Sequence, residues 1–235
     1  MIEYNCQTFL NKFLEKEVLL KHDNSRKNAL LIIETRPSLN LILVIKNALT
    51  IFKNHNLIVA GSTWVFKLIE KCIGNEFHKI NINKIKISVK ELNNLLTDKN
   101  FWSVIKEENI LVFQSDCLIL RDYDFENFKY GMIGPVSLNK YENSFVINGG
   151  FSLRKKDLMI ELCNKKKEIN VNEDIYFSNL IRSNYSELMP SMQECNNFAI
   201  ESWGNPLTAI GIHGTDKYYC SSQLFIEVFK NLEFR

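Results

Sequence analysis

Short apolar runs alternate with longer amphipathic stretches through the first half of the chain. The runs at 29–33, 57–60 and 110–113 are too short for helices and apolar enough for strands buried on both faces. Apolar residues at helical spacing predict helices at 6–14, 39–52, 64–72 and 89–96, with a helical extension at 101–105; one or two short strands fall within 77–87. Strands that alternate with helices indicate a mostly parallel central sheet flanked by crossover helices.

The pattern becomes irregular after residue 113. We expect strands at 130–134 and 145–154 around a loop at 135–144, helices at 155–163 and 173–180, a turn at 203–206 and a last helix at 223–232. From residue 189 onward the sequence otherwise offers only short apolar pieces. No repeat, low-complexity tract or linker divides the chain. We therefore expect a single α/β domain over residues 1–235, with a regular first half and a loop-rich second half.

Composition and charge narrow the functional classes. Hydrophobic residues make up 46% of the chain and charged residues 24%, which is typical of a globular protein. The net charge of +2 argues against nucleic acid as the main partner, and no apolar run approaches the roughly 18 residues of a membrane-spanning helix. The 6 cysteines are scattered without paired spacing, which is typical of a reducing compartment. We therefore expect a soluble cytoplasmic protein.

Polar clusters follow two of the predicted strands. Glu34, Thr35 and Arg36 come directly after the first strand, and Gln114, Ser115 and Asp116 come directly after the central strand. The carboxyl ends of the strands are where open α/β sheets bind ligands. The arginine fork suits a phosphate group, and the aspartate is a hard oxygen ligand for Mg²⁺ or Mn²⁺. Each cluster also has a purely structural explanation. Glu34 and Arg36 can be ordinary loop charges, and Asp116 can stabilise a turn.

Three further polar positions lie in the second half. They are Asn148 with Gly149 and Gly150, Asn172 with Glu173 and Asp174, and His213 between two glycines. Paired glycines in a strand-like run indicate either close approach of a ligand or a bulge. Carboxylates at a helix start are either helix caps or a rigidly held general base. A lone histidine is either a structural residue or a metal ligand.

The clusters together, in this order, resemble a family of microbial and viral GT-A-type glycosyltransferases. The matching motifs are Ile-Ile-Glu34-Thr-Arg36-Pro37, Phe113-Gln-Ser-Asp116, Asn148-Gly-Gly-Phe-Ser-Leu-Arg154, Asn172-Glu-Asp174-Ile-Tyr-Phe177 and Gly211-Ile-His213. They span about residues 29 to 217. The third and fourth motifs are the most specific. The resemblance implies a single GT-A-like domain, with a nucleotide-sugar-binding half at about 29–134 and an acceptor and catalytic half at about 135–217.

The resemblance also implies an activity. Such an enzyme moves a sugar from a UDP-, GDP- or dTDP-linked donor to a glycan or another hydroxyl acceptor, with Mn²⁺ or Mg²⁺ bound at the donor diphosphate. A carboxylate base that deprotonates the acceptor would invert the configuration at the sugar. The sequence departs from the Asp-x-Asp form of the metal motif, since Gln114 stands where the first acidic residue would be.

The resemblance assigns a role to each cluster. Asp116 and His213 match the metal ligands. Residues 34–36 match the loop that receives the nucleoside, and 114–116 complete the donor site. Asn148, Gly149 and Gly150 match the segment that lines the donor sugar and the acceptor. Asp174 lies at the position of the catalytic base and is favoured over Glu173.

Two alternatives remain open from the sequence. A sugar nucleotidyltransferase would also use an α/β nucleotide domain, but its glycine-rich phosphate loop has no counterpart in the glycine-free segment 34–37. A non-catalytic module that binds a nucleotide-sugar or a glycan is favoured by Gln114, because this residue leaves one side-chain carboxylate in the motif. Release of nucleoside diphosphate from a donor separates the transferase from the binding module.

Overall fold

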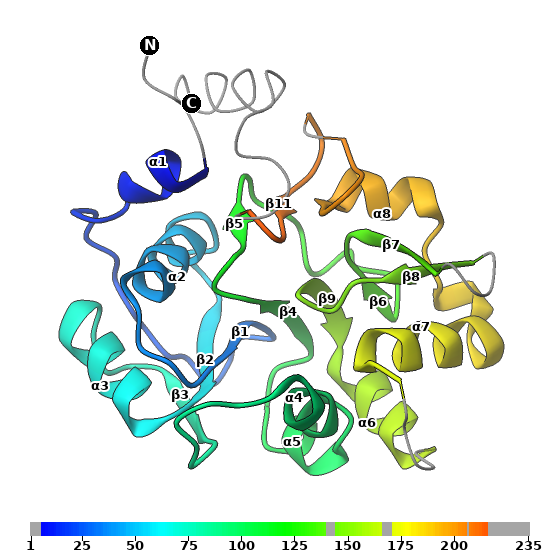
Figure 1. Ribbon diagram of the computed structural model, residues 1–235, viewed down its shortest axis with the longest axis horizontal. Coiled ribbons are helices and arrows are strands. Elements are labelled where there is room, and N and C mark those ends of the chain that lie inside the picture. The colour runs from blue at the N-terminus through cyan, green and yellow to red at the C-terminus, as the bar shows by residue number, and fades with distance from the viewer. Residues whose placement is uncertain (1–5, 140–143, 166–170, 206, 216–235) are drawn as a thin grey trace.

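A computed structural model describes residues 6–139, 144–165, 171–205 and 207–215 of the 235-residue chain. A six-stranded sheet forms its centre, in the order β3 (His78–Asn81), β2 (Asn56–Gly61), β1 (Asn28–Glu34), β4 (Asn109–Phe113), β9 (Phe151–Lys155) and β6 (Met132–Ile133) (Figure 1). The first four of these strands run parallel, and β9 runs antiparallel to both β4 and β6. The predicted mostly parallel α/β sheet is confirmed.

Helices cover both faces of this sheet. The α2 helix (Leu39–Ile51) lies on one side of it, and α4 (Val89–Leu96) and α5 (Lys99–Ser103) lie on the other (Figure 1). The remaining helices among the described residues are α1 (Cys6–Asn11), α3 (Thr63–Cys72), α6 (Lys156–Asn164), α7 (Glu173–Asn184), α8 (Met192–Phe198) and the short 3₁₀ turn η1 (Ser186–Leu188). None of the helices in the described part of the chain has the length and apolar character needed to cross a lipid bilayer.

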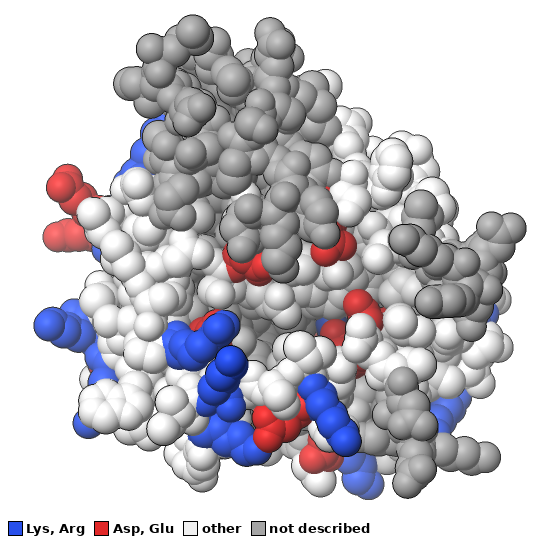
Figure 2. Space-filling model, viewed as in Figure 1, with Lys and Arg blue, Asp and Glu red and all other residues white. Residues whose placement is uncertain are grey.

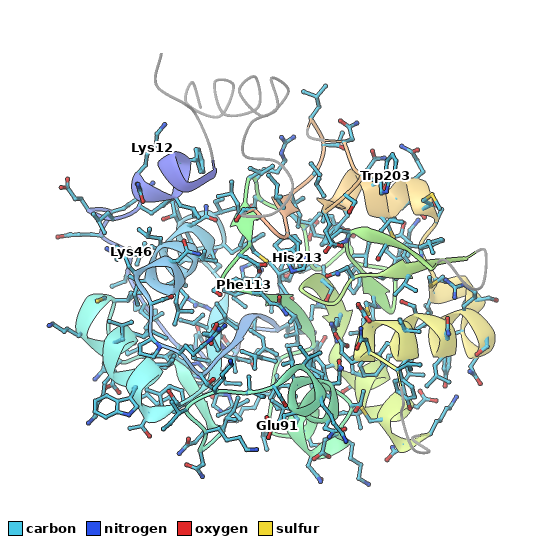
Figure 3. All side chains as sticks on the ribbon, viewed as in Figure 1. Lys12, Lys46, Glu91, Phe113, Trp203 and His213 are labelled. Carbon is cyan, nitrogen blue, oxygen red and sulfur yellow. The ribbon has the colours of Figure 1, made fainter. Side chains whose placement is uncertain are left out.

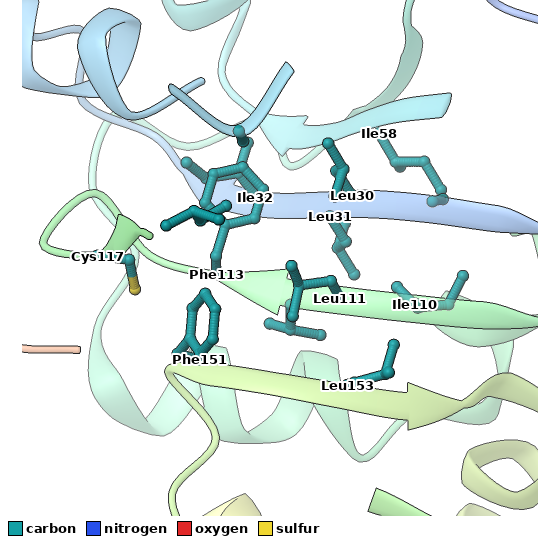
Figure 4. Packing of buried hydrophobic residues seen from close by; sticks show 14 of the residues in the cluster. Leu30, Leu31, Ile32, Ile58, Ile110, Leu111, Phe113, Cys117, Phe151 and Leu153 are labelled. Carbon is teal, nitrogen blue, oxygen red and sulfur yellow. The ribbon is translucent and has the colours of Figure 1, made fainter. Parts of the chain in front are cut away.

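Apolar side chains from neighbouring strands form the core. Leu30 and Ile32 of β1 pack with Leu111 and Phe113 of β4, and Phe151 of β9 continues the cluster (Figure 4). All five side chains are fully buried. These strands therefore read as continuous apolar runs, since helices or other elements cover both faces.

Two small sheets lie in the second half. The strands β7 (Val136–Asn139) and β8 (Ser144–Ile147) pair antiparallel. A three-stranded sheet has the order β10 (Ala199–Ile200), β11 (Gly211–Ile212) and β5 (Leu118–Ile119), with β11 parallel to β10 and antiparallel to β5. Its strands are two residues long, yet they position the site described below.

Several predictions for the second half are wrong. The segment 135–144, predicted as a loop, contains β7. The single strand predicted at 145–154 is two strands, β8 and β9, because the chain turns at 148–150. The α8 helix was not predicted, since only Cys195 and Phe198 of its seven residues are buried; the capping box of Ser191 and Glu194 is its one sequence signal. The helix predicted at 223–232 lies outside the described residues.

Candidate functional site

The loop after β1 is organised around the carboxylate of Glu34. Its Oε1 accepts hydrogen bonds from the backbone N–H groups of Thr35 and Arg36, both at 2.9 Å, and from Arg36 Nε at 3.0 Å. Burial by itself would raise the pKa of the Glu34 carboxyl, but the hydrogen bonds and the charge of Arg36 outweigh it and lower this pKa. Glu34 therefore holds the Arg36 guanidinium at the carboxyl end of the sheet.

The first two polar clusters meet at one cavity of about 360 Å³. Glu34 and Arg36 line it on the β1 side, and Gln114, Ser115 and Asp116 line it on the β4 side. These clusters are neighbours because β1 and β4 are adjacent parallel strands, with Ile32 opposite Phe113. The apolar part of the wall comes from Ile33, Ile87, Val89 and Leu92. Figure 2 shows this face, with basic side chains on one side of a central hollow and acidic side chains around the rest.

A larger cavity, of about 710 Å³, lies at the opposite edge of the sheet, near the start of β1. Arg26 and Lys27 line it together with three carboxylates, Asp122, Asp124 and Glu126. None of the predicted site residues belongs to it. The first two predicted clusters converge instead at the smaller cavity.

The three-stranded sheet brings three polar residues together. Asp116 lies two residues before β5, His213 directly follows β11, and Glu201 directly follows β10. Because β10 and β11 are parallel with Ile200 opposite Ile212, the residues that follow them, Glu201 and His213, become neighbours. The antiparallel pairing of β11 with β5 carries His213 back to Asp116. The backbone bond from Thr215 N to the Asp116 carbonyl, 3.0 Å, extends this connection.

The imidazole of His213 stands at the centre of this group. Its Nε2 lies 3.2 Å from Gln114 Oε1 and 3.6 Å from Asp116 Oδ1, and its Nδ1 lies 3.2 Å from Glu201 Oε1. Figure 3 shows His213 beside Phe113, at the end of β4. The Nδ1 atom faces Glu201 without hydrogen-bond geometry, and Nε2 faces Gln114 and Asp116. A carboxylate beside the other ring nitrogen commonly accompanies a metal-binding imidazole.

The donor set at His213 fits a divalent cation. Asp116, Cys117 and His213 offer ligand atoms that lie within 4.8 Å of one another. Burial and the nearby Asp116 charge raise the pKa of the Cys117 thiol well above its usual range, and its Sγ donates to the Gly150 carbonyl at 3.3 Å. The thiol is therefore neutral and holds the turn. Asp116, His213 and the Gln114 amide oxygen remain as the oxygen and nitrogen donors that Mn²⁺ accepts.

The turn at 148–150 lies between the two halves of the site. Asn148 Oδ1 accepts from Gly150 N at 2.7 Å, and Asn148 Nδ2 donates to Glu201 Oε1 at 3.3 Å. A Cβ on Gly150 would lie 2.2 Å from His213 Nε2, and a Cβ on Gly149 would lie 1.9 Å from Glu173 Oε1. Both glycines are therefore needed because side chains of the site approach the backbone closely.

Glu173 belongs to a buried ion pair. Arg154 Nη1 donates to Glu173 Oε2 at 2.9 Å, and Arg154 Nη2 donates to Glu173 Oε1 at 3.0 Å. The Arg154 side chain is fully buried, and Glu173 is 6% exposed. Arg154 also donates from Nε to Ser152 Oγ and from Nη2 to the Gly149 carbonyl. Both oxygens of Glu173 are thus engaged by Arg154, which also holds the turn at 148–150.

The Asp174 carboxyl at the start of α7 has a raised pKa. It sits in the first turn of α7, and its Oδ1 accepts from the Ile175 N–H at 2.8 Å. Burial, followed by the negative charge of Glu173, raises the pKa of the Asp174 carboxyl to about 6. A base with a pKa near the working pH is ionised and still accepts a proton readily.

Glu201 is the site residue that the sequence did not reveal. Of the predicted residues, all of 34–36 and 114–116 except Thr35 line the cavity, and Thr35 is buried. The predicted residues of the turn at 148–150 adjoin the other three, which are Glu173, Asp174 and His213. Glu201 contacts both Asn148 and His213. The one sequence signal for Glu201 is its position directly after the apolar pair Ala199 and Ile200. His213 has the same position relative to Gly211 and Ile212.

Comparisons with known proteins place the chain in a family. No curated protein matches it. The solved structure of the apo-form glycosyltransferase GlyE from Streptococcus pneumoniae TIGR4 is similar with a TM-score of 0.46 and 12% identity, over 71% of this chain and 46% of that chain. The chain thus spans less than half of that enzyme, and this likeness is too weak to assign an activity. A family model matches residues 76–213, which is more than half of the chain. The protein therefore belongs to the family described as "Protein of unknown function (DUF5672)".

Proposed function

We propose that this protein is a glycosyltransferase that moves a sugar from a nucleoside-diphosphate donor to a hydroxyl acceptor. One observation carries the proposal. Asp116 and His213 form a candidate cation site at one end of a cavity that Arg36 also lines, and a carboxylate of raised pKa, Asp174, stands beside the adjoining turn at 148–150. Arg36 would bind the donor, a cation held by Asp116 and His213 would neutralise the diphosphate, and Asp174 would deprotonate the acceptor.

The cavity beside Glu34 and Arg36 would receive the nucleoside. Its volume of about 360 Å³ falls within the range of small-molecule sites. Ile33, Ile87 and Leu92 give it an apolar wall for the base and the ribose, and Glu34 fixes the Arg36 guanidinium at its rim. The guanidinium offers planar donors suited to phosphate or ribose oxygens.

Asp116 and His213 would hold the cation, with Gln114 as a neutral third donor. When bound, Mn²⁺ or Mg²⁺ neutralises the charge that develops on the departing diphosphate. The separation of 3.6 Å between His213 Nε2 and Asp116 Oδ1 is less than twice the usual metal–ligand distance of about 2.1 Å, so both atoms can bind one ion. Gln114 thereby supplies an oxygen where the Asp-x-Asp motif carries a carboxylate.

Asp174 would act as the base. The acceptor oxygen attacks the anomeric carbon as its proton passes to the Asp174 carboxylate. The bond between the anomeric carbon and the diphosphate oxygen breaks, and the nucleoside diphosphate leaves with that electron pair. Attack from the face opposite the leaving group inverts the anomeric configuration. Asn148 and the backbone of the two glycines line the path between Asp174 and His213.

The Asp116→Ala variant tests the cation site. We expect donor turnover to fall at least about a hundredfold, because the variant loses the one carboxylate that the site offers to the cation. Release of nucleoside diphosphate measures turnover, and circular dichroism checks the fold. The matched control is Asp122→Ala, which removes an exposed carboxylate six residues further along the same segment. Unchanged turnover in Asp116→Ala would exclude the metal role.

The Glu201→Ala variant tests the residue behind His213. We expect it to weaken Mn²⁺ binding about 10- to 100-fold, because the imidazole loses the negative charge 3.2 Å from its Nδ1. Isothermal titration of the protein with Mn²⁺ measures the affinity directly. Glu187→Ala, which removes an exposed carboxylate in η1, is the control. Equal affinities in both variants would show that Glu201 does not support the metal site.

The activity itself is tested with a panel of UDP-, GDP- and dTDP-sugars and Mn²⁺, with and without hydroxyl acceptors. We expect nucleoside diphosphate to be released from at least one donor and the acceptor to gain one sugar. A donor that binds without turnover under any condition would favour the binding module instead. Formation of a nucleotide-sugar from a nucleoside triphosphate and a sugar phosphate would favour the nucleotidyltransferase.

A further inference from the structure

A further cavity lies beside the one at Glu34 and Arg36, between α4 and the start of α7. It measures about 360 Å³ and is lined by Val89, Lys90, Asn93 and Asn94 of α4 and by Val171 and Asn172 before α7. Val89 also lines the donor cavity, so the two spaces adjoin at the first residue of α4. We call this further space the α4–α7 cavity. None of the roles proposed above uses it.

The lining of the α4–α7 cavity is rich in amides and poor in charge. Asn94 presents a carbonyl acceptor and an N–H₂ donor, and Asn172 presents its N–H₂ donor. The amide of Asn93 also lines the cavity but is hydrogen-bonded within the protein. Lys90 is the single charged side chain among the described lining residues, and no carboxylate is among them. Such a surface offers hydrogen-bond donors and acceptors to the hydroxyl groups of a neutral ligand. Among the described lining residues, a phosphate or carboxylate ligand would meet one cation, Lys90.

Two valines add apolar contacts to this polar lining. Val89 is 69% exposed and Val171 is 47% exposed, which is high for β-branched apolar side chains. A sugar ring presents hydroxyl groups at its edge and C–H groups on its faces. The combination of amides with small exposed apolar side chains matches both parts of such a ring.

The amide of Asn172 faces α4 instead of its own helix. An asparagine at the N-cap usually accepts a hydrogen bond from the first turn of its helix, but Asn172 makes no such bond. Asn93 replaces it, because its Oδ1 accepts from the Glu173 N–H at 3.0 Å while its Nδ2 donates to Asn172 Oδ1 at 3.1 Å. The first turn of α7, which carries Asp174, is therefore fixed to the wall of the α4–α7 cavity.

We propose that the α4–α7 cavity binds a neutral saccharide unit of the acceptor, adjacent to the unit whose hydroxyl group reaches Asp174. This inference rests on the proposed glycosyltransferase function. It identifies the acceptor as a glycan of at least two sugar units. Asn172 and Asp174 are two residues apart at the start of one helix, so the same short segment contacts both units. An acceptor without the second unit reacts more slowly because it lacks these contacts.

The Asn94→Trp variant tests the cavity without touching the donor site. Asn94 is exposed, so a large side chain there fills the cavity and leaves the core intact. Asn94→Ala is the second variant, which removes the amide alone. Asn100→Trp, at an exposed position of α5 outside both cavities, is the matched control. Binding is measured on an array of neutral di- and trisaccharides. Donor hydrolysis is measured separately with the nucleotide-sugar panel, with water as the only acceptor.

We expect the wild-type protein and Asn100→Trp to bind the same neutral glycans, and Asn94→Trp to bind them at least about tenfold more weakly. Donor hydrolysis by water should be equal in all of these proteins, since it needs no acceptor site. Equal glycan binding by Asn94→Trp and the wild type would overturn the inference. Donor hydrolysis without binding of any glycan would also overturn it, and the proposed function would stand. Glycan binding that Asn94→Trp abolishes, without turnover of any donor, would support the cavity and reject the transferase.

Discussion

The Glu173→Ala variant should lose about 3–5 kcal/mol of the free energy of unfolding. This substitution removes both carboxylate oxygens from Arg154, whose side chain is fully buried between β9 and α7. The guanidinium lies over the rings of Trp102 and Phe177, at 5.8 and 5.7 Å from their centroids, so water cannot replace the lost carboxylate without disturbing the core. A charged group that remains buried without its counter-ion accounts for most of the loss. Urea denaturation at neutral pH measures it.

Two variants separate this explanation from simple loss of contacts. In the double variant Arg154→Met with Glu173→Leu, no buried charge remains, and we expect most of the lost stability to return. The exposed pair of Lys27 and Glu108, with side chains 66% and 56% exposed, is the control, and Glu108→Ala should cost less than about 1 kcal/mol. A double variant as unstable as Glu173→Ala would show that packing, and not the buried charge, dominates.

The Asp174→Asn variant should lose sugar transfer by about 10²- to 10⁴-fold and keep its affinity for the nucleotide. Asparagine preserves the size of the side chain but does not accept the acceptor's proton. Because the pKa of Asp174 is raised to about 6, transfer by the wild-type protein should fall as the pH is lowered through 6. Initial rates of transfer between pH 5 and 8 measure both effects. Retained transfer in Asp174→Asn would make Asp174 a helix-capping residue.

The same substitution should stabilise the protein at neutral pH. Burial raises the pKa of Asp174 in the folded state from an ordinary 3.8 to about 6, so the folded protein holds a proton that the unfolded chain releases in this range. The stability from this group is fully present below pH 4 and is lost as the pH rises through 6. At pH 7 the ionised carboxylate therefore costs at most about 3 kcal/mol, which asparagine restores. Urea denaturation should show no difference between the two proteins near pH 3.

The first half of the fold could be predicted because each element is self-contained in the sequence. The strands β1, β2 and β4 are continuous apolar runs, and the serines before α2, α3 and α4 cap these helices. The polar clusters after β1 and β4 were expected to lie at the carboxyl edge. Their contact across one cavity depends on strand order, since β4 pairs with β1 and not with β3. Strand order is not encoded by any single segment.

The site around His213 could be predicted only in part. Asp116 and His213 came from motif order, but the two-residue strands that join them are too short to show a hydrophobic period. Glu201 was missed for the same reason, since β10 is the apolar pair Ala199 and Ile200. Arg154 belongs to the motif at 148–154 and Glu173 to the motif at 172–177. Neither motif by itself shows that these two residues form an ion pair. Local patterns predicted the elements, and long-range pairing determined which side chains meet.

The three-stranded sheet also sets when the site can form during synthesis of the chain. The parallel strands β1 to β4 lie within residues 28–113, whereas Gln114 and His213 are 99 residues apart in the sequence. A ribosome adds about 5–20 residues per second, and N-terminal parts fold first. The cavity lined by Glu34 and Arg36 therefore gains its walls several seconds before β11 leaves the ribosome. Until then a nascent chain has neither His213 nor Glu201 beside Asp116, so the unfinished protein cannot assemble the proposed cation site.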